Sequence, residues 1–139
     1  MALVRRLKNR SQFQAVLAGV IIARTAHFAL HRNALDALAL QAQPGKFDGA
    51  KALFPVQDMW VGAMVPKRWA RKAVTRNTIK RQIYAVCADF SQHYSQAALV
   101  IRLRSGFART EFISASSRQL KQAVRSEVQA LLQAGTSAP

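Results

Sequence analysis

Most residues of this 139-residue chain that could do chemistry are basic, and a third of the 21 Lys and Arg residues lie in one short stretch. The sequence KRWARKAVTRNTIKR, residues 67–81, holds seven Lys or Arg and no acid. Lys and Arg bind phosphate oxygens, whereas charged runs on solvated helix faces usually alternate in sign. The lack of compensating acids therefore indicates that this stretch binds a polyanion. Asn77 adds a donor and an acceptor, which suits an RNA surface with phosphates and 2′-hydroxyls.

Groups that could break a bond are fewer. The six acidic residues are scattered, whereas a metal-dependent nuclease needs two or three carboxylates that converge on its ions. His27 and His31 could face the same side of one strand and act as acid and base on an RNA 2′-hydroxyl, although we favour surface histidines on a short strand. Cys87 falls in an apolar stripe and is expected in the core rather than as a nucleophile. We therefore predict no catalytic residue and no metal ligand in the protein.

The composition fits one folded domain with a polyanionic partner. Apolar residues make up 50% of the chain, and 21 basic against 6 acidic residues give a formal net charge of +15. Such an excess destabilises a compact chain by self-repulsion, so nucleic acid is the leading candidate partner and an anionic membrane surface the second. One cysteine excludes an internal disulfide and fits the cytoplasm. The apolar run at residues 15–23 is too short to cross a bilayer, and we interpret it as a helix end and a strand rather than a signal peptide.

Seven elements are expected to position the basic stretch, in the order α-β-β-β-α-β-α. The first helix is capped by Asn9, with Gln12 three residues later and Gly19 as its stop signal. Short β-type runs predict strands at residues 20–23, 27–31, 59–65 and 97–103. The third and fourth strands flank the basic helix, and such a βαβ crossover usually makes two strands parallel. We predict an α+β fold, a single-domain α/β sandwich with a mixed four-stranded sheet.

The basic stretch runs into a helix that begins near Ala73. On this helix Arg76 lies one turn from Lys80, and Asn77 one turn from Arg81, so these four form a row on the flank and solvent side. Four further cations lie in the loop before the helix, where the helix N-terminus also favours phosphate: Lys67, Arg68, Arg71 and Lys72. One buried stripe is expected from the apolar residues Ile79, Ile83, Val86, Cys87 and Phe90.

The chain is expected to end in an amphipathic helix at about Ser114 to Gln133, with Leu120, Val124, Val128 and Leu131 on one face. We predict a single RNA-binding domain at residues 1–133. Residues 34–58 are interpreted as an Ala/Gln-rich loop insertion, and residues 134–139 as a disordered tail.

The segment VPKRWARKAVTRNTIKRQIYAV, residues 65–86, resembles the signature of the bacterial ribonuclease P protein component. That signature has a strand ending in Val, a Lys-Lys/Arg pair, a basic loop, and Arg-Asn followed by Lys-Arg. The resemblance extends over nearly the whole chain. The matching positions are Lys67, Arg68, Lys72, Ala73, Val74, Arg76, Asn77, Lys80 and Arg81. The sequence departs from the usual family residues at Leu17, Ala70, Thr78, Tyr84 and Ala85. Many members carry Arg at the position of Thr78, and an Arg-Glu pair at the positions of Tyr84 and Ala85.

The resemblance implies a fold and a function. The fold is an α/β sandwich with a left-handed crossover, and its Arg-Asn helix binds the catalytic RNA subunit. The RNA-binding residues carried over, with the adjacent loop, are Lys67, Arg68, Arg71, Lys72, Arg76, Asn77, Lys80 and Arg81. The holoenzyme removes the 5′ leader of precursor tRNA with Mg²⁺ held mainly by the RNA. The location implied is the bacterial cytoplasm, with neither membrane nor DNA as a partner.

A second surface, between the first helix and the sheet, is implied to hold the single-stranded leader. Phe13 matches an aromatic position of this surface, although an aromatic on a short helix also fits core packing. Phe28 lies in the matching strand with its side chain toward either the cleft or the core, and His31 falls near another such position. Two other functions fit the residues: an RNA-binding module of another ribonucleoprotein, or a self-sufficient ribonuclease that uses His27 or His31.

Overall fold

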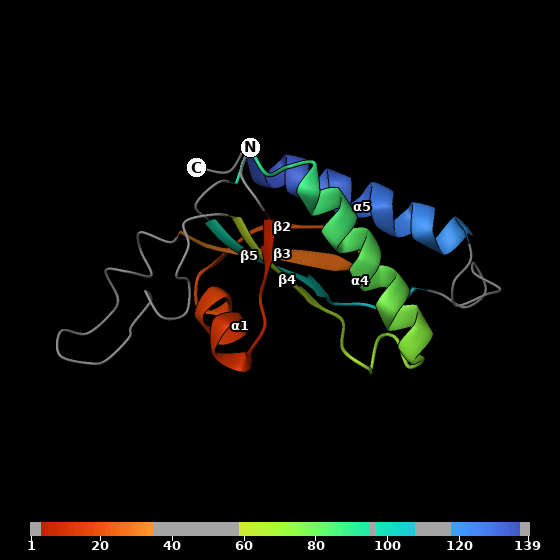
Figure 1. Ribbon diagram of the computed structural model, residues 1–139. Helices are drawn as coiled ribbons and strands as arrows, with labels where there is room; N and C mark the ends of the chain where they lie inside the picture. Colours follow the sequence, from red (N-terminus) through yellow and green to blue (C-terminus); the bar gives the residue numbers. More distant parts are fainter. Residues whose placement is uncertain (1–3, 35–58, 95–96, 108–117, 137–139) are drawn as a thin grey trace.

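The computed structural model describes residues 4–34, 59–94, 97–107 and 118–136, which form one sheet and three helices (Figure 1). The predicted insertion lies outside the described residues apart from Ala34. The strands are β1 (Val4–Arg6), β2 (Val20–Arg24), β3 (Phe28–Ala34), β4 (Met59–Met64) and β5 (Ala97–Leu103). The helices are α1 (Arg10–Leu17), α4 (Ala73–Ala88) and α5 (Arg118–Thr136).

The sheet has five strands in the order β1-β4-β5-β3-β2. β4 pairs in parallel with both β1 and β5, whereas β3 pairs antiparallel with both β5 and β2. The mixed sheet and the parallel β4-α4-β5 unit are therefore confirmed, while the handedness of this crossover stays a prediction. The strand count was one too low, because β1 is a three-residue strand of one valine and two arginines that has no recognisable alternation.

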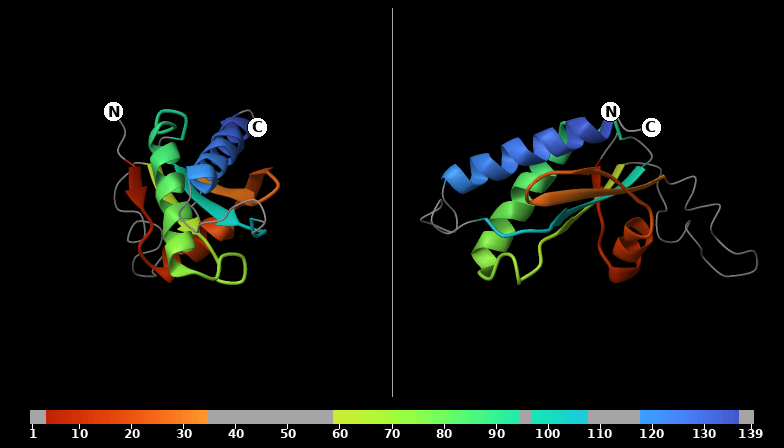
Figure 2. Two further views of the ribbon diagram at one scale, coloured as in Figure 1. Left: turned by 90° about the vertical axis from the view of Figure 1, so that its right-hand side faces the viewer. Right: turned by 180° about the vertical axis from the view of Figure 1, so that it is seen from behind.

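Helices α4 and α5 lie side by side over one face of the sheet, and α1 lies on the other (Figures 1 and 2). Because strand side chains alternate between faces, each strand contributes to two separate clusters. The larger cluster includes Ile83 of α4, Val124 of α5 and Leu99 of β5. The smaller cluster lies under α1 and includes Val16, Trp60 and Val100. The sheet thus separates the side that carries α4 from the side that carries α1.

The predicted stop and start signals of α1 are confirmed. The Gln12 backbone N–H donates to the Asn9 side-chain oxygen at 2.9 Å, and the Gln12 side-chain oxygen accepts from the Lys8 N–H at 2.6 Å. The first bond satisfies an N–H group that the helix start leaves unpaired, and the second joins the residue before the cap to the helix. After the last helical residue, a Cβ at Gly19 would collide with the Arg32 carbonyl oxygen, so the chain needs glycine for the close approach to β3.

The end of α5 lies further along the chain than the sequence suggested. The helix continues to Thr136, so the prediction of a disordered tail was wrong for residues 134–136. Gly135 is buried, and its missing side chain leaves room for Tyr94 and Leu30. The Tyr94 hydroxyl donates to the Leu132 carbonyl at 2.6 Å, and this tertiary contact fixes a segment whose polar composition resembles a tail.

Glu127 holds the middle of α5 to the turn between β2 and β3. Its carboxylate accepts from the Thr25 hydroxyl at 2.6 Å, and from the His27 backbone N–H and the His27 Nδ1, each at 2.7 Å. The His27 ring also stacks on Phe107 with centroids 4.0 Å apart. Arg104 closes the same region, because its backbone N–H donates to the His27 carbonyl at 2.7 Å. The turn, the end of β5 and α5 are therefore joined at one end of the sheet.

Candidate nucleic-acid interface

The predicted basic residues lie on the loop before α4 and on the first two turns of that helix. Six of these side chains are exposed: Lys67, Arg68, Arg71, Lys72, Asn77 and Arg81. Arg76 and Lys80 are half-buried. Residues 59–88, which include β4, the loop and α4, contain no acid at all. This side of the molecule therefore combines fixed positive charge with the positive end of a helix dipole, a combination that favours phosphate groups.

The loop at residues 66–72 is held in one shape by backbone acceptors. The Trp69 and Ala70 N–H groups donate to the Pro66 carbonyl at 3.1 and 3.2 Å. The Arg76 guanidinium donates through Nη1 to the Ala70 carbonyl at 3.1 Å and to the Arg71 carbonyl at 2.7 Å. Arg76 therefore fixes the loop that carries the other cations, a role that helical spacing did not reveal.

Thr78 does not belong to the outward-facing row. Its side chain is buried, and its hydroxyl donates to the Val74 carbonyl at 2.8 Å. The position directly precedes Ile79, so it lies on the edge of the buried stripe. Thr78, where many family members carry Arg, therefore changes the buried face of α4 and not its exposed row of donors. The outward row consists of Asn77, Lys80 and Arg81.

A hollow of about 240 Å³ lies beside this row, and it includes two residues that sequence reasoning did not assign to the interface. Its lining residues are Arg6, Asn77, Lys80, Arg81 and Tyr84. The Arg6 guanidinium lies over the Tyr84 ring, 4.1 Å from its centroid. The only sign of Arg6 in the sequence is a pair of arginines near the N-terminus. This signal is weak, because the position of Arg6 depends on the pairing of β1 with β4.

Of the two orientations left open for Phe28, the structure shows the one toward the core, so Phe28 does not belong to the leader-binding surface. Phe28 has no exposed surface and lies in the cluster beneath α4 and α5, together with Leu30. Residues two apart on a strand share a face, so Phe28 and Leu30 point away from α1 while His31 points toward it. The sequence could not decide this, because both faces of β3 are covered by apolar residues.

Phe13 and His31 do lie on the α1 side of the sheet. A Cβ at Gly62 would lie 2.5 Å from the Phe13 ring, so this half-buried ring rests directly on β4. His31 pairs with Val100 of β5, a member of the smaller cluster, and is itself 6% exposed. Arg102 Nε donates to His31 Nε2 at 3.2 Å, which places a guanidinium on this surface.

The surroundings of His31 lower its pKa below the usual value of 6.5, chiefly through burial and further through the charges of Arg102 and Arg24. In the unfolded chain the imidazole regains its ordinary pKa, so the unfolded state binds more protons between the two values. The stability from neutral His31 is present above pH 6.5 and is lost as the pH falls toward the folded pKa.

We expect urea unfolding of His31→Leu to show a smaller loss of stability on acidification than the wild type, and the exposed His93→Ala to match the wild type. Parallel pH profiles for wild type and His31→Leu would contradict this.

The residues considered for catalysis do not come together. His27 contacts Glu127 of α5, whereas His31 lies on the α1 side, so the two do not share one side of a strand. The reason is that His27 belongs to the turn before β3. The favoured prediction of surface histidines was wrong for His31, which is buried. Cys87 is buried as expected, and burial raises the pKa of its thiol to about 12. Within the described ranges, no three His, Cys, Asp or Glu side chains are grouped as a metal site would require.

The fold and the basic surface define a class: a small α/β sandwich that presents a polyanion-binding loop and crossover helix from one sheet. Residues 1–133 match the family model described as Ribonuclease P, and the chain therefore belongs to the ribonuclease P family. The prediction of a ribonuclease P protein subunit is thereby confirmed, and with it a partner that is RNA. Among curated proteins, none matches the chain.

Solved structures show the same fold. A structure of the RNase P protein of Staphylococcus aureus at 2.0 Å has a TM-score of 0.62 and 16% identity, and the match covers 92% of each chain. A mutant of that protein, described as defective in mRNA degradation activity, has a TM-score of 0.59 and 16% identity over 92% of this chain and 85% of its own. A further S. aureus structure has a TM-score of 0.58 and 16% identity over 96% and 90% of the two chains.

None of the three helices in the described part of the chain is long and apolar enough to cross a membrane.

Proposed function

We propose that the chain binds the catalytic RNA subunit of ribonuclease P through loop 66–72 and α4, and the 5′ leader of precursor tRNA on the α1 side of the sheet. The observation that carries the first assignment is an ordered basic loop and helix within thirty residues, 59–88, that contain no acid. The second assignment is supported by Phe13 and by Arg102, an aromatic ring and a guanidinium on one sheet face. The leader and the RNA subunit would thus bind opposite sides of the protein, in the bacterial cytoplasm.

In this proposal the protein neutralises phosphates and holds the leader, and the RNA subunit performs the hydrolysis. The exposed cations release counterions when they bind RNA, so affinity falls steeply with salt. Mg²⁺ is assigned to the RNA, because the described residues offer no cluster of ligands that fits it. No step of the hydrolysis is assigned to a protein side chain.

Leader release from precursor tRNA tests the proposal. The chain is mixed with its cognate RNA subunit and precursor tRNA at low Mg²⁺, and cleavage is compared with that by the RNA alone. We expect faster leader release with the protein, and a larger gain for a long leader than for a leader of one nucleotide. Absence of stimulation at every salt and Mg²⁺ concentration would reject the function. Cleavage by the chain without added RNA would instead favour a self-sufficient ribonuclease.

Trp69 is expected to stack on an unpaired base of the RNA subunit. Trp69 is 38% exposed on the ordered loop, and the Arg68 guanidinium carbon lies 5.3 Å from the centroid of its ring. Because stacking releases no counterions, we expect Trp69→Ala to weaken binding by about 1–3 kcal/mol with an unchanged salt dependence, and Trp69→Phe to retain most of the affinity. In a Trp60→Phe background, RNA should also quench the fluorescence of Trp69. An unchanged affinity in Trp69→Ala would contradict the stacking role.

A further inference from the structure

The hollow between β1 and α4 collects donors from two distant parts of the chain. α4 contributes Asn77, Lys80 and Arg81, and β1 contributes Arg6. The hollow is open, and its volume of about 240 Å³ is small compared with a folded protein segment. Three cations and one amide in this space match a single anionic group with several acceptor oxygens.

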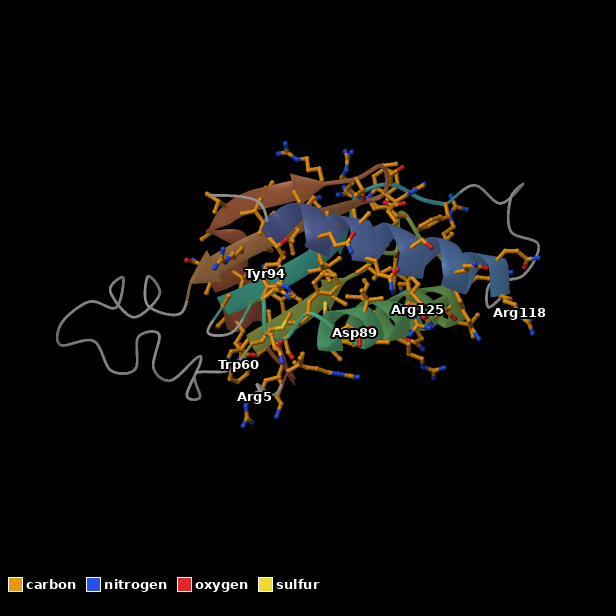
Figure 3. The ribbon with its side chains drawn as sticks, turned by 90° about the horizontal axis from the view of Figure 1, so that it is seen from above. Arg5, Trp60, Asp89, Tyr94, Arg118 and Arg125 are labelled. Carbon is orange, nitrogen blue, oxygen red and sulfur yellow. The ribbon has the colours of Figure 1, made fainter. Side chains whose placement is uncertain are left out.

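The pairing of β1 determines which arginine reaches the hollow. β1 runs parallel to β4, with Arg6 opposite Val61 and Arg5 opposite Trp60. Val61 belongs to the cluster beneath α4, and Trp60 to the cluster beneath α1. Arg6 and Arg5 therefore point to opposite faces of the sheet; Figure 3 shows Arg5 beside Trp60. The two arginines are neighbours in the sequence and the same type of residue, but their surroundings in the structure differ.

Tyr84 provides the support for Arg6. Its hydroxyl accepts a hydrogen bond from the Ala63 backbone N–H at 3.2 Å, which fixes the ring against β4. The Arg6 guanidinium lies over this ring at 4.1 Å. Stacking uses the flat face of a guanidinium and leaves its N–H groups, which lie in the plane, available to acceptors. The ring thus restricts Arg6 without occupying its donors.

We infer that Arg6 is part of the RNA interface and that the hollow binds a phosphodiester group of the RNA subunit. Arg6 and Arg81 supply guanidinium donors, Lys80 adds an ammonium group, and Asn77 offers an amide to a phosphate or ribose oxygen. Tyr84 is a positioning residue that acts through Arg6. The inference rests on the proposed function, since it names a contact within the same interface. It extends that interface from one helix to the edge strand of the sheet.

Equilibrium binding to the cognate RNA subunit at several salt concentrations tests Arg6. We expect Arg6→Ala to lower affinity about tenfold and the salt slope by about one charge. Arg6→Lys should keep the slope and lose part of the affinity, because an ammonium group lacks the planar fork. Arg5→Ala is the matched control, since it removes the same charge one residue away on the other face. Arg6→Ala and Arg5→Ala with equal affinities for the RNA would overturn the inference.

A double-mutant cycle tests the positioning role of Tyr84. Tyr84→Leu should weaken RNA binding in the wild type and have little effect in Arg6→Ala, whereas additive losses would overturn the role. The same cycle measured by urea unfolding separates folding defects from binding, and Arg6→Gln serves if Arg6→Ala fails to fold.

As a probe without RNA, inorganic phosphate should shift the Arg6 Nε–Hε NMR signal in the wild type but not in Tyr84→Leu. Wild-type protein that does not bind the RNA rejects the proposed function, whereas wild-type binding with an insensitive Arg6 rejects only this inference.

Discussion

Arg76→Ala is expected to weaken binding to the RNA subunit more than Lys80→Ala, by about tenfold or more against a few-fold. Lys80 acts as one charge beside the hollow, so its loss removes one contact. Arg76 also donates to the carbonyls of Ala70 and Arg71, and its loss frees the loop that carries four other cations. A loosened loop must be ordered again when RNA binds, and this ordering costs conformational entropy.

The salt dependence of the affinity separates the two roles of Arg76. Both variants should lower the slope by about one charge, but Arg76→Ala should lower the affinity further at every salt concentration. Arg76→Lys keeps the charge and should recover the slope without the full affinity, because one ammonium group reaches the two carbonyls less well than a planar guanidinium. Equal losses in Arg76→Ala and Lys80→Ala would show that the loop keeps its shape without Arg76.

Glu127→Ala is expected to destabilise the protein by about 2–4 kcal/mol, the largest effect on folding that we predict outside the apolar core. The carboxylate accepts three hydrogen bonds from Thr25 and His27, and these side chains are partly buried. Alanine would leave a backbone N–H, a hydroxyl and an imidazole without their acceptor. Bonds to an ionised acceptor are stronger than neutral ones, so their loss is costly.

Urea unfolding measures this effect, with Gln129→Ala as the control on an exposed position of the same helix. Glu127→Gln should fall between wild type and Glu127→Ala, because an amide keeps one acceptor oxygen and replaces the other with donors. Under conditions where it is folded, Glu127→Ala should bind the RNA subunit nearly as tightly as wild type, since no residue of α5 lines the hollow. An unfolding free energy equal to that of Gln129→Ala would contradict the role of Glu127.

The sequence allowed most elements of this fold to be predicted because each has a strong local pattern. The stripe of Ile79, Ile83 and Val86 located α4, and the caps at Asn9 and Gly19 located α1. The β4-α4-β5 unit followed from the order of two apolar runs around a basic helix. These patterns are set by neighbouring residues and need no knowledge of the tertiary structure.

The features that the sequence did not predict depend on pairing between distant segments of the chain. β1 is a strand because β4 offers it a partner, and only that pairing brings Arg6 to Tyr84. The face of Phe28 was left open because its strand is covered on both sides, by α5 on one face and by α1 on the other. The role of Arg76 depends on a loop conformation that its own helix cannot specify. For the interface, the kinds of residue were therefore predictable from the sequence, but the separate role of each residue was not.

Gly62 has a consequence for how the two sides of the protein can vary. Because it has no side chain, the Phe13 ring lies directly on β4, and a Cβ there would also lie 2.7 Å from Leu7. The absence of a side chain at Gly62 thus lets α1 pack directly against the backbone of the sheet. A larger residue would lift α1 and alter the proposed leader surface while leaving every cation around the hollow in place. The proposed leader surface and the basic surface on the opposite face can therefore change independently of each other.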